Sequence, residues 1–205
     1  MWRIVLLLGV LIGLNSCASL EPDQSAIQAP PGIAAGSVTY SGRYSKYRVM
    51  YRQLPKGVSG SFEYGDSGFP PPGDFKDRTL RGAVFAENLP AGEYEIYRWH
   101  IRSGLFSVES TNPFSIRFRI DPTKVIYLGN FHFTVTRSLG LSATGATLTY
   151  KDAIGRDLPV LKEKFPGVSE QSIAYALTSG TEQENLGGSH RTTFTPIFVP
   201  YVRFR

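Results

Sequence analysis

The chain's single cysteine, Cys17, is the feature that most constrains what this sequence can fold into. It follows an uninterrupted apolar run over 4–14 (IVLLLGVLIGL), which Arg3 precedes. A run of eleven residues is too short to span a bilayer and fits the hydrophobic region of a signal peptide. Since there is no second cysteine, the folded part has no disulfide and no thiolate, and its core alone must stabilise it.

The residues that end in Cys17 resemble the lipobox of bacterial lipoproteins. In Leu14-Asn15-Ser16-Cys17, a branched aliphatic residue, a tolerant position and a small residue precede the cysteine. The resemblance implies that the signal peptide 1–16 is cleaved between Ser16 and Cys17. It also implies that Cys17 carries a thioether-linked diacylglycerol and an N-acyl chain such as palmitate. The alternative is an ordinary secretory signal with a chance cysteine at the cleavage site.

The residue after the cysteine, Ala18, sets the location that this resemblance implies. Alanine rather than aspartate here implies sorting to the outer membrane, with the lipid-anchored protein facing the periplasm. Two or three acyl chains hold a protein stably on a membrane, whereas one gives only marginal binding. The covalent lipid on Cys17 is the only cofactor that we expect.

The part that follows residue 16 has 189 residues, enough for one domain with an appendage. It contains 21 basic and 17 acidic residues, a small net charge of +4. Its longest basic clusters, 43–52, 98–102 and 117–119, alternate with apolar residues, as on the solvent faces of strands. Nucleic-acid binding needs a concentrated basic stripe, and we exclude it. A weak attraction to anionic lipid headgroups is compatible with this charge.

Composition divides the same part into three. Residues 18–36 (ASLEPDQSAIQAPPGIAAG) have no hydrophobic period, and we expect 17–36 to be the lipidated cysteine and a flexible tether. A β-sandwich domain is expected over 37–150. Helical and extended segments over 151–205 are expected to form an appendage that packs on the sandwich.

Alternating apolar and polar residues predict strands in the central part. The clearest case is Phe114–Ile120 (FSIRFRI), in which every second residue is apolar and is expected to point inward. The prolines and glycines of 66–78 predict a long loop, and Leu89-Pro90-Ala91-Gly92 predicts a turn. Further strands are expected over Ser37–Tyr44, Lys46–Leu54, Val58–Tyr64, Glu93–Ile101, Lys124–Gly129, Phe131–Arg137 and Ala146–Tyr150, with a bulge or bend at Gly129-Asn130.

The C-terminal part has a different pattern. Helical spacing of apolar residues covers 154–165 and 168–177, and Ser169 is a candidate N-cap of the second stretch. The two prolines within Thr193–Phe204 predict an edge strand or a surface ribbon.

Two stretches resemble known β-sandwich modules. Leu89–Tyr94 (LPAGEY) is similar to the L-P-x-G-x-Y turn and strand of prealbumin-like and carboxypeptidase-regulatory-like sandwiches. Asp121–Gly129 is similar to a stretch of uncharacterised bacterial envelope lipoproteins with this architecture. The resemblance covers about residues 83–135. It implies a mainly β fold, an immunoglobulin/prealbumin-like antiparallel β-sandwich with a short helical segment near 154–178, and it carries no catalytic residue across.

Three histidines are the candidates for metal or acid–base chemistry. His100 and His132 lie in expected strands, and paired strands could place both imidazoles on a metal with Glu95 or Asp121. The alternative, more common for a strand histidine, is a surface position or a hydrogen-bonded place in the core. His190 lies in a glycine-rich loop and is expected to be solvated.

Nucleophilic catalysis has little support in this sequence. The chain contains no Gly-x-Ser-x-Gly elbow, and its only cysteine is expected to carry lipid. Asp152 and Asp157 flank Gly155-Arg156 before the expected helix and are candidate turn and cap residues. We therefore expect that the protein is not an enzyme.

Aromatic residues make up 13% of the chain, which allows two interpretations. Tyr97, Trp99, Phe106, Tyr127 and Phe131 could form a platform that stacks on sugars, with Trp99 and Tyr97 as the candidate glycan-binding residues. Alternatively they belong to the core of a β-protein built without disulfides, the interpretation that we favour.

Together these observations predict a lipid-anchored, periplasm-facing envelope lipoprotein. We expect a non-catalytic accessory or structural protein that docks another envelope component, with an envelope protein as its partner. One alternative is a glycan-binding β-sandwich module that uses exposed aromatic residues. The other is a metal-dependent enzyme at paired strand histidines.

Overall fold

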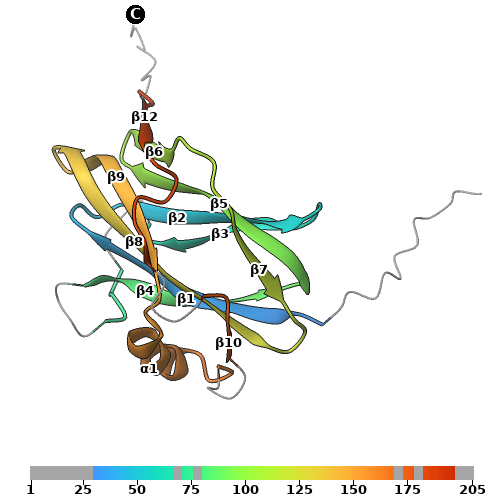
Figure 1. Ribbon diagram of the computed structural model, residues 1–205. Helices are drawn as coiled ribbons and strands as arrows, with labels where there is room; N and C mark the ends of the chain where they lie inside the picture. Colours follow the sequence, from blue (N-terminus) through green and yellow to red (C-terminus); the bar gives the residue numbers. More distant parts are fainter. Residues whose placement is uncertain (1–29, 67–70, 76–79, 169–172, 178–181, 197–205) are drawn as a thin grey trace, which may run out of the picture.

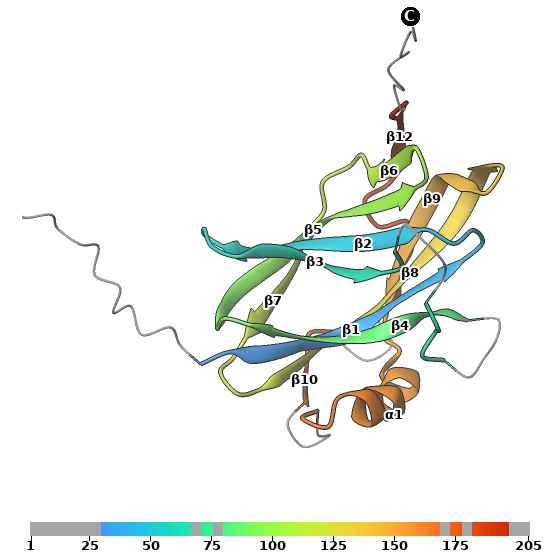
Figure 2. The ribbon, with the colours of Figure 1, turned by 180° about the vertical axis from the view of Figure 1, so that it is seen from behind.

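Two packed β-sheets and one α-helix make up the part of the chain that the computed structural model describes (Figure 1). The described residues are 30–66, 71–75, 80–168, 173–177 and 182–196. The helix, α1 (Ile154–Lys164), lies on the outer face of one sheet (Figures 1 and 2). The structure confirms a mainly β sandwich with a short helical segment. The immunoglobulin/prealbumin-like assignment stays a prediction.

Within the described residues each sheet contains six strands, and most pairs are antiparallel. The first sheet has the order β11-β9-β8-β1-β4, with β10 paired to β8, and β1 and β10 run parallel to β8. Its strands are β1 (Gly32–Ser41), β4 (Arg81–Leu89), β8 (Val125–Leu139), β9 (Ser142–Lys151), β10 (Ile173–Tyr175) and β11 (Glu182–Gln183).

The second sheet has the order β12-β6-β5-β2-β3, with β7 paired to β5. Its strands are β2 (Lys46–Leu54), β3 (Ser59–Tyr64), β5 (Gly92–Ser103), β6 (Phe106–Ser110), β7 (Ile116–Ile120) and β12 (His190–Phe194). In β7 the apolar residues point inward as expected, with Phe118 and Ile120 buried and the alternating Arg117 and Arg119 exposed.

Strand β1 begins at Gly32, five residues before the expected start at Ser37, so the expected tether ends earlier. The pattern missed this start because β1 is buried on both faces and needs no polar alternation. The glycine and alanine residues in its first half leave room for the neighbouring strands, which approach closely here. A Cβ at Gly36, for example, would lie 2.8 Å from Cζ of Phe85 in β4.

Two bulges change which side chains reach the core. At Gly129, whose φ is +98°, the register between β1 and β8 shifts, which confirms the expected bulge and makes one continuous strand of two expected ones. In β5, Ile96 pairs with Tyr51 but Arg98 pairs with Met50, so Tyr97 is the extra residue. Ile96 and Trp99 therefore both point inward, contrary to strict period two.

The core between the sheets is rich in aromatic rings. Phe62 of β3 stacks on Phe85 of β4 with ring centroids 4.3 Å apart, which joins the two sheets along one side. Trp99 of β5 meets Phe133 of β8 edge to face at 5.9 Å, again across the sheets. Each buried aromatic side chain contributes about 1.5–3 kcal/mol, so these rings take the place of the missing disulfides.

The described parts of 151–205 contribute strands to both sheets. Helix α1 confirms the first expected helical stretch, whereas Ile173–Tyr175, within the second, form β10 on the edge of β8. Strands β11 and β12 extend β9 and β6, so this region pairs with the sandwich as well as packing on it. The candidate N-cap Ser169 lies outside the described residues.

Candidate functional site

The residues of the expected lipid site, Ser16 and Cys17, lie outside the described part of the chain. The first described residue is Pro30, two residues before β1 begins. Lipidation of Cys17 stays a prediction from the sequence.

Trp99, the first candidate glycan-binding residue, is fully buried. Its ring lies between the sheets, and its Nε1 donates a hydrogen bond to the backbone oxygen of Leu186 at 2.8 Å. The alternative in which Trp99 is exposed to a sugar is therefore wrong, and the favoured core position is confirmed for this residue, because the bulge at Tyr97 turns its side chain inward. Trp99 therefore cannot present a face to a sugar.

Tyr97 is half-buried on the outer side of the second sheet. The Arg52 guanidinium lies over its ring, 4.8 Å from the centroid, so a cation already occupies this face. The other members of the expected platform are dispersed. Tyr127 and Phe131 are buried, and Phe106 packs on Phe194 with centroids 5.2 Å apart.

His100 and His132 are not brought together, because they belong to different sheets, His100 to β5 and His132 to β8. Burial lowers the pKa of both imidazoles, and nearby cations lower it further. Within the described residues, no group of three histidine, aspartate or glutamate side chains is placed to hold a metal ion. The alternative in which paired strands bring both imidazoles to one metal ion is therefore not formed by the described residues.

His190 lies in β12 and its Nε2 is 3.0 Å from Nη2 of Arg137. Burial and the charge of Arg137 lower its pKa. The residue is thus part of a strand, which corrects the expected loop position.

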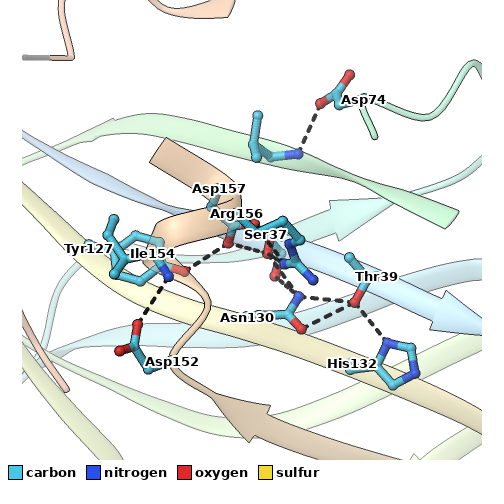
Figure 3. A network of polar contacts seen from close by, with 11 residues as sticks. Ser37, Thr39, Asp74, Tyr127, Asn130, His132, Asp152, Ile154, Arg156 and Asp157 are labelled. Atoms are coloured by element: carbon cyan, nitrogen blue, oxygen red, sulfur yellow. Dashed lines mark hydrogen bonds and ion pairs between the residues drawn. The ribbon is translucent and has the colours of Figure 1, made fainter. Parts of the chain in front are cut away.

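The densest polar cluster links α1 to the first sheet (Figure 3). At its centre is Asp157, which is fully buried although it carries an ionisable carboxyl group. Ser37 Oγ and Tyr127 OH donate hydrogen bonds to Asp157 Oδ2 at 2.6 and 2.7 Å. Arg156 approaches the other carboxylate oxygen, with Nε at 2.7 Å and Nη2 at 2.6 Å. The sequence placed Asp157 as a turn or cap residue, but it lies within the helix and faces the sheet.

Local structure explains how α1 delivers Asp157. Asp152 accepts a hydrogen bond from the backbone nitrogen of Ile154 at 3.0 Å, which confirms the expected turn at this residue. The N-cap itself is Ala153, which makes no side-chain capping hydrogen bond. Asp157 and Leu161 are four residues apart and so share one helix face, and both are buried. A mainly apolar cluster that includes Val84, Tyr127 and Leu161 surrounds the contact.

The cluster continues from Ser37 along the outer face of β1 and β8. The Asn130 side-chain amide lies 2.8 Å from Ser37 Oγ and 2.9 Å from Thr39 Oγ1. Two donors, Arg156 Nη2 and the Phe131 backbone nitrogen, lie 3.2 and 3.3 Å from the same amide atom, which they favour as the oxygen. Thr39 Oγ1 then contacts His132 Nδ1 at 2.8 Å.

This arrangement contains a serine, an aspartate and a histidine, but not in catalytic order. Ser37 bonds Asp157 directly, whereas a catalytic serine needs a general base such as imidazole beside it. Ser37, Thr39, Asn130 and Asp157 are all fully buried, so a substrate has no access to them. What the cluster can do is fasten α1 to the sheet. A second contact of the helix is the ion pair between Lys164 Nζ and Asp74 Oδ2 at 2.8 Å, which ties α1 to the segment that precedes β4.

Among the open hollows that described residues line elsewhere on the surface are two with charged side chains in their linings. One of about 360 Å³ lies between β7 and β10, where Arg119 pairs with both Glu93 and Asp121, at 3.1 and 2.9 Å. The other, of about 320 Å³, lies beside the β1–β2 turn and is lined by Arg43 and Arg137. Neither combines a nucleophile with a base.

Comparison with known proteins gives no assignment. No protein-family model, curated protein or solved structure matches this chain. Among the described residues, no helix is long and apolar enough to cross a membrane.

Proposed function

We propose that the protein is a lipid-anchored lipoprotein of the outer membrane, facing the periplasm, which acts without catalysis by docking another envelope protein. The observation that carries the proposal is the apolar run over 4–14 that ends in Leu14-Asn15-Ser16-Cys17, with the only cysteine of the chain at the position of the lipid acceptor. The acyl chains on Cys17 attach the protein to the bilayer.

The proposed mechanism is tethering. Fourteen residues separate Cys17 from the start of β1 at Gly32. A short connection of this kind confines the sandwich near the membrane and raises its effective concentration for a weakly bound partner into the millimolar range. A weak docking contact is then sufficient for association at the membrane.

The internal chemistry of the sandwich supports a non-catalytic role. Asp157 and Ser37, which would be the most reactive pair in a catalytic arrangement, are buried and bonded to each other. The histidines of the two sheets do not converge. The polar groups of this buried cluster therefore stabilise the fold itself, which favours an accessory function over an enzymatic one.

Two measurements in cells test the proposal. Metabolic labelling with a palmitate analogue should label the protein, and Cys17→Ser should abolish the label, since no other cysteine is present. Crosslinking in intact cells, followed by affinity purification and mass spectrometry, should recover one reproducible envelope protein that the Cys17→Ser variant loses. Absence of the acyl label would overturn the anchor. Recovery of peptidoglycan or polysaccharide instead of a protein would overturn the proposed partner class.

A further inference from the structure

One end of the sandwich combines four segments that are far apart in the sequence. We call this end the tip, and it consists of 41–46, 102–108, 134–146 and 190–196. These segments contain the β1–β2, β5–β6 and β8–β9 turns and strand β12. In both views β6, β9 and β12 gather at this end, while the start of β1 lies at the other (Figures 1 and 2).

Side-chain hydrogen bonds hold the three turns of the tip together. Ser45 Oγ donates to Ser103 Oγ at 2.8 Å, and both serines are buried. Ser103 Oγ also accepts a hydrogen bond from the backbone nitrogen of Ala143 at 2.8 Å. Strand β12 is attached through Thr192 Oγ1, which donates to the Thr144 carbonyl oxygen at 2.7 Å. The tip is therefore a fixed surface rather than a set of independent loops.

The tip carries most of the large apolar side chains that the described residues expose. Six such side chains are exposed in this part of the chain, and four of them lie at the tip. They are Leu105, Leu139, Leu141 and Phe194, with exposed fractions of 39%, 65%, 82% and 54%. Large apolar side chains that are exposed together at one end of a protein point to a contact with a membrane or another molecule.

The charge of the tip is of one sign. Its four segments contain five basic residues, and neither aspartate nor glutamate is present in them. Among these basic residues Arg43, Arg102 and Arg137 are exposed, and within the described residues none of the three forms an ion pair. All 17 acidic residues of the chain lie outside the four segments of the tip.

We infer that the tip binds the surface of an anionic phospholipid bilayer. Leucine and phenylalanine side chains that project from a rigid turn enter the interface between headgroups and acyl chains, and flanking arginines attract the anionic headgroups. The tip supplies both components in one surface. It gives the protein a second contact with a membrane, separate from the lipid on Cys17 that the proposed function assumes.

Chain length allows both contacts to be made with one membrane. Strand β1 leads from Gly32 to the tip, and its ten residues span about 33 Å. The fourteen residues between Cys17 and Gly32 can extend to at most about 50 Å. The chain before β1 is thus long enough to run the length of the sandwich, so that the tip and the anchor reach the same bilayer surface.

The test uses the full chain, purified from membranes and reconstituted into vesicles of phosphatidylcholine alone or with phosphatidylglycerol. Leu141→Cys is labelled with an environment-sensitive fluorophore. Val58→Cys, in the β2–β3 turn at the opposite end and also exposed, is the matched control. We expect a blue shift at position 141, with quenching by nitroxide lipids, in the anionic vesicles only, and no shift at position 58.

Charge is tested separately. Each arginine near an anionic surface strengthens binding about five-fold, so Arg43→Gln with Arg102→Gln should lower the bound fraction, and 1 M salt should remove the shift. An aqueous spectrum at position 141 in both kinds of vesicle, or equal shifts at both positions, would overturn the inference. So would a shift that needs added envelope proteins, which would make the tip a protein-binding surface.

The anchor and the tip fail independently in this experiment. If Cys17 carries no lipid, the chain without an added cysteine takes up the label at Cys17 and does not stay in the vesicles after washing, which refutes the anchor. If the anchor is present and the tip is not a membrane contact, the protein stays in the vesicles while the label at position 141 reports water.

Discussion

Replacement of Asp157 by alanine is the substitution that most directly tests how α1 is attached. The carboxylate is fully buried and is surrounded by Ser37, Tyr127 and Arg156. The substitution leaves two hydroxyl groups and one guanidinium group without their acceptor. Arg156 loses its ion pair but keeps two contacts. Its Nη2 bonds Ser37 Oγ at 2.9 Å, and its guanidinium lies over the ring of Phe75 at 4.6 Å.

The expected loss follows from the burial of this pair. Removing one partner of a buried ion pair costs about 3–5 kcal/mol, because the other charge stays without compensation. The Arg156 side chain is 29% exposed and can turn toward water, which moves the expected value to the lower end, about 3 kcal/mol. Glu182→Ala is the matched control. Glu182 pairs with Lys151 at 3.7 Å on the surface, where such pairs contribute at most about 1 kcal/mol.

Urea unfolding of the purified variants measures both losses. Trp99 is the only tryptophan after residue 16 and lies in the core, so its fluorescence follows the sandwich. The midpoint should fall strongly for Asp157→Ala and little for Glu182→Ala, with the slope of the transition unchanged. A loss below about 1 kcal/mol for Asp157→Ala would refute a buried, charged and fully paired carboxylate at this place.

Three further outcomes are expected. Trp99→Ala should cost about 3–5 kcal/mol in urea unfolding followed by circular dichroism, because a fully buried ring leaves a cavity, and a loss under 1 kcal/mol would contradict its core position. Gly129→Ala should destabilise the fold by more than about 1 kcal/mol, since φ is +98° and a Cβ would meet Leu177 and the Lys151 carbonyl; unchanged stability would contradict the bulge. Burial lowers the pKa of His132 below about 6.5, so the unfolded chain binds more protons and stability should fall from pH 7 to 5. His132→Gln should flatten this decline in urea titrations at both pH values, and an equal decline would exclude the residue.

The strands that face solvent on one side could be predicted from the sequence. The expected bounds of Lys46–Leu54 coincide with β2, and Phe114–Ile120 contains β7 with its apolar face inward. Both strands alternate because one side meets the core and the other meets water. Strand β1 does not alternate, since sheet and helix cover both of its faces, and the sequence of its first half therefore predicts a tether instead of a strand.

The side-chain direction in β5 could not be predicted beyond the bulge. A period-two count from Tyr94 places Trp99 on the same face of the strand as Tyr97 and on the opposite face from Ile96. One extra residue in the strand reverses this assignment for every position that follows. Nothing in the residues Ile96–Trp99 marks the bulge, because it is set by pairing with Met50 and Tyr51 of a distant strand.

The buried cluster at Asp157 was missed for a related reason. The spacing of Asp157 and Leu161 on one helix face was visible, but an aspartate before an apolar residue is read as a cap or a solvated group. Its partners Ser37 and Tyr127 lie 120 and 30 residues away and have no local pattern. Only the parallel pairing of β1 with β8 brings these hydroxyl groups to one surface.

The Asp157 cluster and the tip differ in how many of their groups are free to bind another molecule. In the Asp157 cluster each charge meets a partner within the chain, so binding a ligand there would require breaking about 3 kcal/mol or more of internal contacts. At the tip, Leu139 and Leu141 already lie in water and Arg43 and Arg102 have no acidic partner among the described residues. Binding at the tip removes apolar surface from water and breaks no internal contact, so the free energy of association favours the tip over the buried cluster.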